Sequence, residues 1–96
     1  MFMHVDAVTY EGGFKLRLLF NNGVAKVVDL KDELSGPVFE PLRNREVFCL
    51  VAVNRDTGTI EWPNGADFSP EVLYELGVVV DSTPTLKVAE ARVPYG

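Results

Sequence analysis

The sequence has little of what disulfide and metal chemistry need. Among its 96 residues there is one cysteine, Cys49, and one histidine, His4. A single cysteine cannot form an internal disulfide, which fits a reducing compartment, and we expect a cytoplasmic protein. These two residues cannot complete a set of four zinc ligands, and no EF-hand spacing is present, so we expect no metal and no cofactor. Cys49 lies in the apolar run 47–53, which predicts a buried, inert thiol.

Positive charge and long apolar runs are also scarce. Nine Lys and Arg stand against fourteen Asp and Glu, for a net charge of −5. Nucleic acids and anionic membranes bind clustered cations, so the composition argues against both as ligands. No apolar run approaches the roughly 20 residues of a membrane-spanning helix, and the first ten residues lack the apolar core of a signal peptide. An acidic surface favours solubility and also suits a basic protein partner.

Catalytic motifs are absent as well. The sequence has no G-x-S-x-G motif, no phosphate-binding loop and no dinucleotide fingerprint. A serine or cysteine nucleophile needs a base, and only His4 could serve in the usual way. We therefore expect a protein that is not an enzyme. The alternative is a small enzyme in which Asp6 or Asp67 works with His4 as an acid–base pair.

The densest local signals lie in the stretch 62–73, W-P-N-G-A-D-F-S-P-E-V-L. The Ser-Pro pair at 69–70 supplies a helix N-cap and a first helical residue, and the glycine at 77 is a natural stop. These signals predict one short helix over 70–76. At about two turns such a helix must gain its stability from packing. We expect its apolar face to consist of Val72, Leu73 and Leu76.

A turn precedes this helix. Asn64-Gly65 is a typical turn pair, because glycine accepts positive φ and asparagine tolerates it. Trp62 ends a strand, and we expect it to bury a large area and to have a partner for its indole N–H. The carboxylate of Asp67 either accepts backbone N–H groups within the turn or faces a partner.

Residues 14–30 predict a β-hairpin. Apolar and polar residues alternate along its first half, as in a half-buried strand. The Asn-Gly pair at 22–23 favours a two-residue type I′ loop, which would place Leu18 opposite Val27. A three-residue loop would instead place Lys26 opposite Leu18 on the apolar face, so we favour the shorter loop.

These patterns together predict an α+β fold, with a small, mostly antiparallel sheet and one short helix. We expect residues 1–80 to form a single domain and 81–96 to form a tail or arm. The run 47–53 is apolar on both faces, which predicts a central, well-covered strand. The other strands that we expect beside the hairpin lie at 3–10, at 59–62 and, as a β-branched segment, at 78–80.

The stretch W-P-N-G-A-D-F-S-P-E-x-L resembles the signature of a family of small bacterial proteins, domain of unknown function 2442. The segments L-R-L-L-F-N-N-G-V-A-K-V-V-D-L at 16–30 and F-E-P-L at 39–42 are similar to that family too, and the resemblance covers roughly residues 3–77. It implies no established enzymatic activity, and a fold like the N-terminal domain of a protein described as DNA-binding. It also implies a gene encoded beside another small protein, as in a two-gene or toxin–antitoxin-like module.

We therefore expect a non-enzymatic protein-interaction module, such as the partner or antitoxin-like half of a two-gene bacterial module. Its partner would be a small protein or a second copy of the chain, without direct contact with nucleic acid or membrane. A further alternative is an accessory regulator in a DNA-binding complex, in which the partner contacts the DNA. Exposed edge strands could also add a partner strand. The residues that we expect to contact the partner are Trp62, Asn64, Gly65, Asp67 and Glu71.

Overall fold

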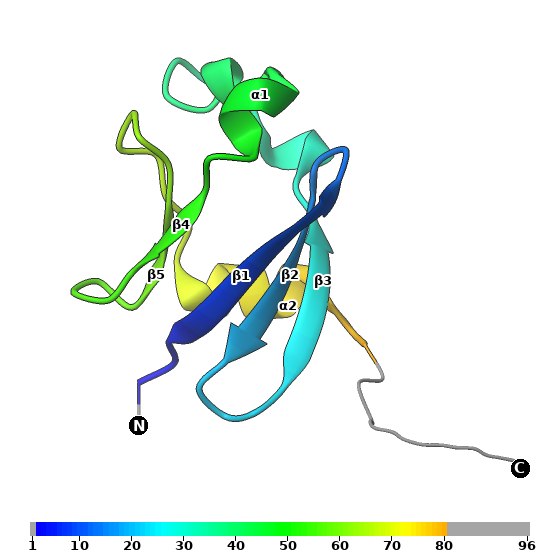
Figure 1. Cartoon of the computed structure of the whole chain (residues 1–96), viewed down its shortest axis with the longest axis vertical. Coiled ribbons are helices and arrows are strands. Elements are labelled where there is room, and N and C mark those ends of the chain that lie inside the picture. The colour runs from blue at the N-terminus through cyan, green and yellow to red at the C-terminus, as the bar shows by residue number, and fades with distance from the viewer. Residues whose placement is uncertain (1, 81–96) are drawn as a thin grey trace, which may run out of the picture.

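The computed structural model describes residues 2–80, and its main element is a four-stranded antiparallel sheet of order β1-β2-β3-β6 (Figure 1). Strands β4 and β5 pair with each other in a separate antiparallel hairpin. The predicted α+β class with antiparallel pairing is confirmed. The strands are β1 (Val5–Gly12), β2 (Lys15–Phe20), β3 (Ala25–Asp29), β4 (Ala52–Asn54), β5 (Thr59–Glu61) and β6 (Val78–Val79).

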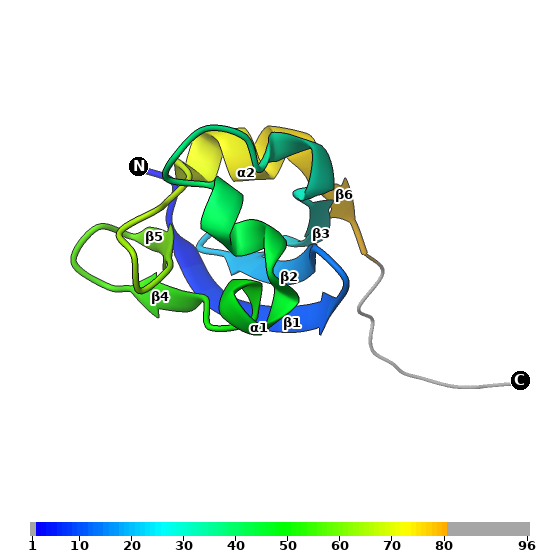
Figure 2. The same ribbon diagram turned by 90° about the horizontal axis from the view of Figure 1, so that it is seen from above.

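Two short α-helices and two 3₁₀ turns connect these strands. Helix α2, Pro70–Leu76, lies across one face of the sheet, whereas α1, Arg45–Phe48, lies near one end of it (Figures 1 and 2). The 3₁₀ turns η1, Lys31–Glu33, and η2, Glu40–Arg43, come between β3 and α1. Helix α2 thus covers one face of the sheet, and the segment from η1 to α1 lies at one end of the sheet (Figures 1 and 2).

Helix α2 begins and ends where its local signals predict. The Ser69 hydroxyl oxygen accepts a hydrogen bond from the Val72 backbone N–H at 3.2 Å, and Gly77 N donates to Leu73 O at 3.0 Å. The expected apolar face is only partly correct. Leu73 is fully buried, but Val72 and Leu76 keep 45% and 39% of their surface exposed. One buried leucine and the half-buried residues beside it therefore anchor this helix.

The side chains of strand β1 do not alternate regularly between the two faces of the sheet. Val5 pairs with Phe20 and Ala7 pairs with Leu19, so that two residues of β1 oppose one of β2. Such a bulge turns Val5 and Val8 toward the same side of the sheet, where both pack in or against the core. The bulge explains why the period-two pattern of this segment is weak in the sequence.

The β2–β3 hairpin has a three-residue loop, so the predicted two-residue type I′ loop is wrong. Phe20 N donates to Val24 O and Gly23 N donates to Phe20 O, each at 2.9 Å. Gly23 has a φ of 86°, which fits the left-handed residue that ends a three-residue loop. As a result Leu18 lies opposite Lys26, in the register that seemed unfavourable for the apolar face.

The buried Lys26 is accommodated by helix α2. Its ammonium Nζ donates a hydrogen bond to the backbone carbonyl of Tyr74 and lies 3.6 Å from the centroid of the Tyr74 ring. The Tyr74 carbonyl is among the last four of the helix, which have no regular intrahelical partner and carry its negative dipole end. The lysine stem also passes close to Gly77, where an added Cβ would lie 2.9 Å from Lys26 Cβ. The register is therefore stabilised by a cation that serves as a helix C-cap.

The predicted central strand over 47–53 is wrong except at Ala52 and Val53, which belong to the separate two-stranded β4–β5 hairpin. In the first half of this run the chain forms the one-turn helix α1, because the Asn44 side chain accepts a hydrogen bond from Glu46 N at 3.0 Å and caps it. Phe48 faces the core, and the strand begins only at Ala52. Cys49 is exposed rather than buried, since it follows Phe48 on the outer side of this turn. A short apolar run does not by itself distinguish strand from helix.

The β-branched segment at 78–80 forms the expected strand. Residues Val78 and Val79 pair with Val27 and Lys26 of β3, and this places β6 at the edge of the sheet. Their side chains remain 70% and 64% exposed. The tail or arm expected over 81–96 lies outside the described residues.

We expect Lys26→Met to lower the free energy of unfolding by about 2 kcal/mol, the usual range for a hydrogen bond from a charged donor. Methionine keeps the apolar stem but leaves the Tyr74 carbonyl without its donor. Urea denaturation followed by tryptophan fluorescence measures the change. Lys15→Met, at an exposed position of β2, is the control and should stay within about 0.5 kcal/mol of the parent. Equal midpoints for the two variants would show that the Lys26 contact is not stabilising.

Candidate functional site

The turn at 62–66 is held by hydrogen bonds between its own residues. Trp62 N donates to Ala66 O and Gly65 N donates to Trp62 O, each at 2.9 Å. The Asn64 side-chain oxygen accepts a third hydrogen bond, from Ala66 N at 3.1 Å. Gly65 has a φ of 88°, in the left-handed region that favours glycine. Of the residues predicted to contact a partner, Gly65 therefore acts by shaping the loop.

Trp62 holds this loop on the core. Its side chain is 2% exposed, and its indole Nε1 donates to Phe48 O at 2.8 Å, as its burial requires. The ring lies 5.6 Å from the Phe48 ring and 6.0 Å from the Phe68 ring, between centroids. A side chain this deeply buried presents almost no surface to a partner. Its contribution to the predicted site is to fix the position of the loop.

Asn64 connects the turn to a distant part of the chain. Its amide nitrogen donates to the Val38 carbonyl at 2.9 Å. A second contact runs beside it, since the Phe39 and Phe68 rings lie 4.9 Å apart between centroids. The loop before η2 is thereby held against the turn. No pattern in the sequence indicates this link, because it joins segments 26 residues apart.

Asp67 and Glu71 are the predicted contact residues that remain accessible. The backbone of Asp67 forms an isolated bridge with Glu61, which fixes its position, but both the Asp67 and Glu71 side chains are exposed. Within residues 2–80 neither carboxylate takes part in a hydrogen bond or ion pair. The Asx-type hydrogen bond considered for Asp67 is made by Asn64 instead.

Two apolar side chains in the neighbouring segments are also exposed. Val38, whose carbonyl is bonded to Asn64, is 50% exposed, and Val72, which follows Glu71, is 45% exposed. We define the turn surface as Val38, Asn64, Asp67, Glu71 and Val72. It combines two exposed apolar side chains with two carboxylates that have no partner within residues 2–80.

His4 and Asp6 lie elsewhere, at the start of β1. Together with Arg55 they line a cavity of about 230 Å³ beside the β4–β5 hairpin. In the described part of the chain no hydrogen bond joins the His4 ring to a carboxylate. Asp67 does not line this cavity. The structure therefore places His4 near Asp6 and does not place it near Asp67.

No group of three or more His, Cys, Asp and Glu within residues 2–80 is arranged to hold a metal ion. Neither α1 nor α2 is long and apolar enough to cross a membrane.

A family model with the description "Protein of unknown function (DUF2442)" matches residues 5–78. No curated protein and no solved structure matches the chain. The expected likeness to the N-terminal domain of a DNA-binding protein therefore stays a prediction.

The two hydrogen bonds of Asn64 predict a graded series of variants. Asn64→Ala removes both and should lower the free energy of unfolding by about 1–2 kcal/mol, the usual sum for two hydrogen bonds at a surface. Asn64→Asp keeps the acceptor for Ala66 N but lacks the donor to Val38 O, so its loss should be about half as large. Urea midpoints measure both. If neither variant shifts the midpoint, the turn is not held by Asn64.

Proposed function

We propose that this chain, which belongs to the family described as "Protein of unknown function (DUF2442)", is a non-enzymatic protein-interaction module of the bacterial cytoplasm. Its partner is a small protein, encoded beside it as in a two-gene or antitoxin-like module, or a second copy of the chain. The proposal includes no direct contact with nucleic acid or membrane. The turn surface is the place where the partner binds.

One observation carries this proposal. The carboxylates of Asp67 and Glu71 are exposed and have no partner within residues 2–80, although the backbone that bears Asp67 is fixed by a β-bridge. An ordered backbone lowers the entropy that must be lost when a partner binds. Charges that complement those of a partner supply specificity and faster association. The turn surface is thus preorganised for basic groups on the partner.

The exposed apolar side chains add a contribution that charge alone lacks. Val38 and Val72 would lose water on contact, at about 25 cal/mol for each Å² of apolar area. Protein interfaces combine apolar contacts with polar and charged groups. This favours a folded protein surface as the partner rather than a free ion.

A role in a DNA-binding complex is a variant of the same proposal. The net charge of −5 opposes direct binding to phosphates, so the partner would have to contact the DNA. The enzymatic alternative has a different basis, which is that His4 and Asp6 line one cavity. It ranks second, because no hydrogen bond between these two side chains prepares a proton transfer in the described structure.

We expect the double variant Asp67→Asn, Glu71→Gln to weaken the complex with the product of the adjacent gene by about tenfold or more, because it removes both negative charges of the turn surface. The two proteins are co-expressed, and affinity is measured by calorimetry after size-exclusion chromatography with mass detection. Asp56→Asn, an exposed carboxylate on the β4–β5 loop, is the matched control and should bind normally.

The thermal midpoint of the double variant must equal that of the parent for this comparison to hold. A folded double variant that binds with unchanged affinity would refute the turn surface as the binding site. A chain that self-associates, and loses that association in the double variant, would identify a second copy as the partner.

A further inference from the structure

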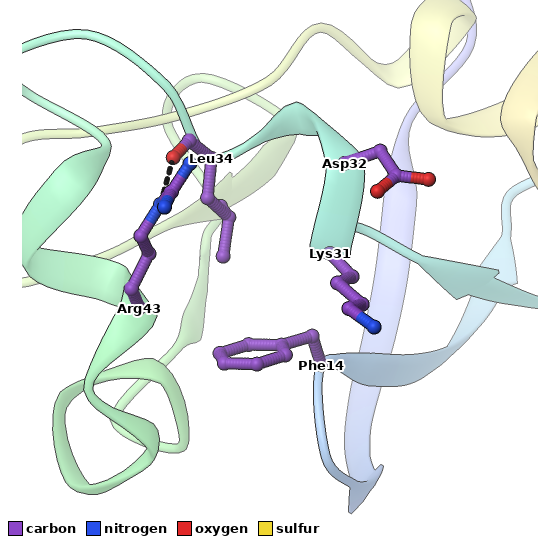
Figure 3. Close-up of a pocket in the computed structure, with 5 residues that line it drawn as sticks. All are labelled: Phe14, Lys31, Asp32, Leu34 and Arg43. Atoms are coloured by element: carbon purple, nitrogen blue, oxygen red, sulfur yellow. Dashed lines mark hydrogen bonds between the residues drawn. The ribbon is translucent and has the colours of Figure 1, made fainter.

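A second cavity, of about 400 Å³, lies where η1 and η2 face the start of β2 (Figure 3). This volume is within the usual range of small-molecule sites. None of the residues that line it belongs to the turn surface. We call it the cationic cavity, and its lining residues are Phe14, Lys31, Asp32, Leu34 and Arg43.

Backbone and side-chain hydrogen bonds bring these residues together from three segments. Leu30 N donates to Phe14 O at 2.9 Å, which sets the beginning of η1 beside the start of β2. Arg43, the last residue of η2, donates from Nε to Leu34 O at 2.7 Å. The same bond is drawn in Figure 3. The cavity therefore has walls that are connected to each other.

The polar groups of the cavity have an excess of positive charge. Arg43 uses Nε for the wall, so its terminal guanidinium nitrogens have no partner within residues 2–80, and neither does the Lys31 ammonium. Asp32 forms no ion pair with either cation, and its carboxylate points away from the Phe14 ring (Figure 3). Both cations line the same cavity, with the Arg43 guanidinium beside the Leu34 carbonyl and the Lys31 ammonium on the other side of the Phe14 ring (Figure 3).

The rest of the cavity is apolar. Phe14 is half-buried, and its ring is held by an edge-on contact with Phe48 at 5.3 Å between centroids. Leu34 is 1% exposed and closes another side. Figure 3 shows the Phe14 ring along one side of the cavity, with Lys31 and Arg43 on either side of it. A ligand that fits would rest an apolar body on Phe14, and an anionic group on that body would lie between the Lys31 and Arg43 sides of the cavity.

From this arrangement we propose that the cationic cavity binds a small organic carboxylate with a flat apolar body. A guanidinium and an ammonium match a carboxylate through charge-assisted hydrogen bonds, and the planar guanidinium binds it in two-pronged fashion. Inorganic phosphate would pair with the cations but would leave the apolar Phe14 side of the cavity exposed to water. A neutral apolar molecule would leave the cations without an anion. This site goes beyond the proposed partner binding and uses none of its residues.

The test uses phenylacetate as the probe and phenylacetamide as its uncharged counterpart. Titration of the full ¹⁵N-labelled chain should shift the amide resonances of residues 31–34 and 43, with a dissociation constant below about 10 mM. Phenylacetamide and inorganic phosphate should each bind at least about threefold more weakly. Phenylacetamide binding as tightly as phenylacetate would overturn the proposal, and so would no shift with phenylacetate at about 10 mM.

Variants that remove one charge each should change the affinity in opposite directions. Lys31→Gln should weaken phenylacetate binding by about three- to tenfold, because it removes one cation. Asp32→Asn should strengthen it by a few fold, because it removes the one anion from the lining. Both side chains are exposed, so folding is unaffected. Arg55→Gln, a cation that lines the other cavity, is the control and should change nothing. Weaker binding by Asp32→Asn would contradict the proposed polarity of the cavity.

Discussion

The hydrogen bond from the buried indole of Trp62 to the Phe48 carbonyl is the contact on which both candidate surfaces depend. An indole N–H left without a partner in the core would cost about 1–3 kcal/mol, so the end of α1 must stay beside β5. The Phe48 ring then contacts Phe14, which forms one side of the cationic cavity. The Trp62 ring contacts Phe68, next to the turn surface. One aromatic cluster thus positions both regions.

The two Asn-Gly pairs of the chain form the same kind of loop, and this explains the one register error. In 20–24 and in 62–66 the first residue bonds to the fifth, and the asparagine side chain accepts from the residue two positions on, at 3.0 and 3.1 Å. In each three-residue loop, asparagine is the second residue and glycine is the third, whereas a two-residue loop would consist of these two residues alone. Asn-Gly suits either arrangement, because both need positive φ at the glycine. In the hairpin the longer loop places Lys26 where it contacts α2.

The sequence predicts an element correctly where residues in or next to that element determine its ends. The ends of α2 followed from a serine cap, a proline and a glycine, all within the helix or next to it. The run 47–53 contains no such unambiguous signal, and the cap that starts α1 is Asn44, outside it. The candidate site divides in the same way. Asp67 is on a turn that the sequence predicts. The hydrogen bond of Asn64 to Val38, and the cavity between η1, η2 and the start of β2, depend instead on contacts between distant segments. A pattern of neighbouring residues does not predict such long-range contacts.

The net charge of the chain does not decide which ligand each surface accepts. At physiological ionic strength charges are screened over about 8 Å, so a bound group interacts mainly with its immediate neighbours. For the turn surface these are the carboxylates of Asp67 and Glu71, and for the cationic cavity they are Lys31 and Arg43. The overall negative charge slows the approach of an anion more than it weakens its binding. An acidic chain can therefore present an anionic surface to a protein partner and a cationic cavity to a small carboxylate without conflict.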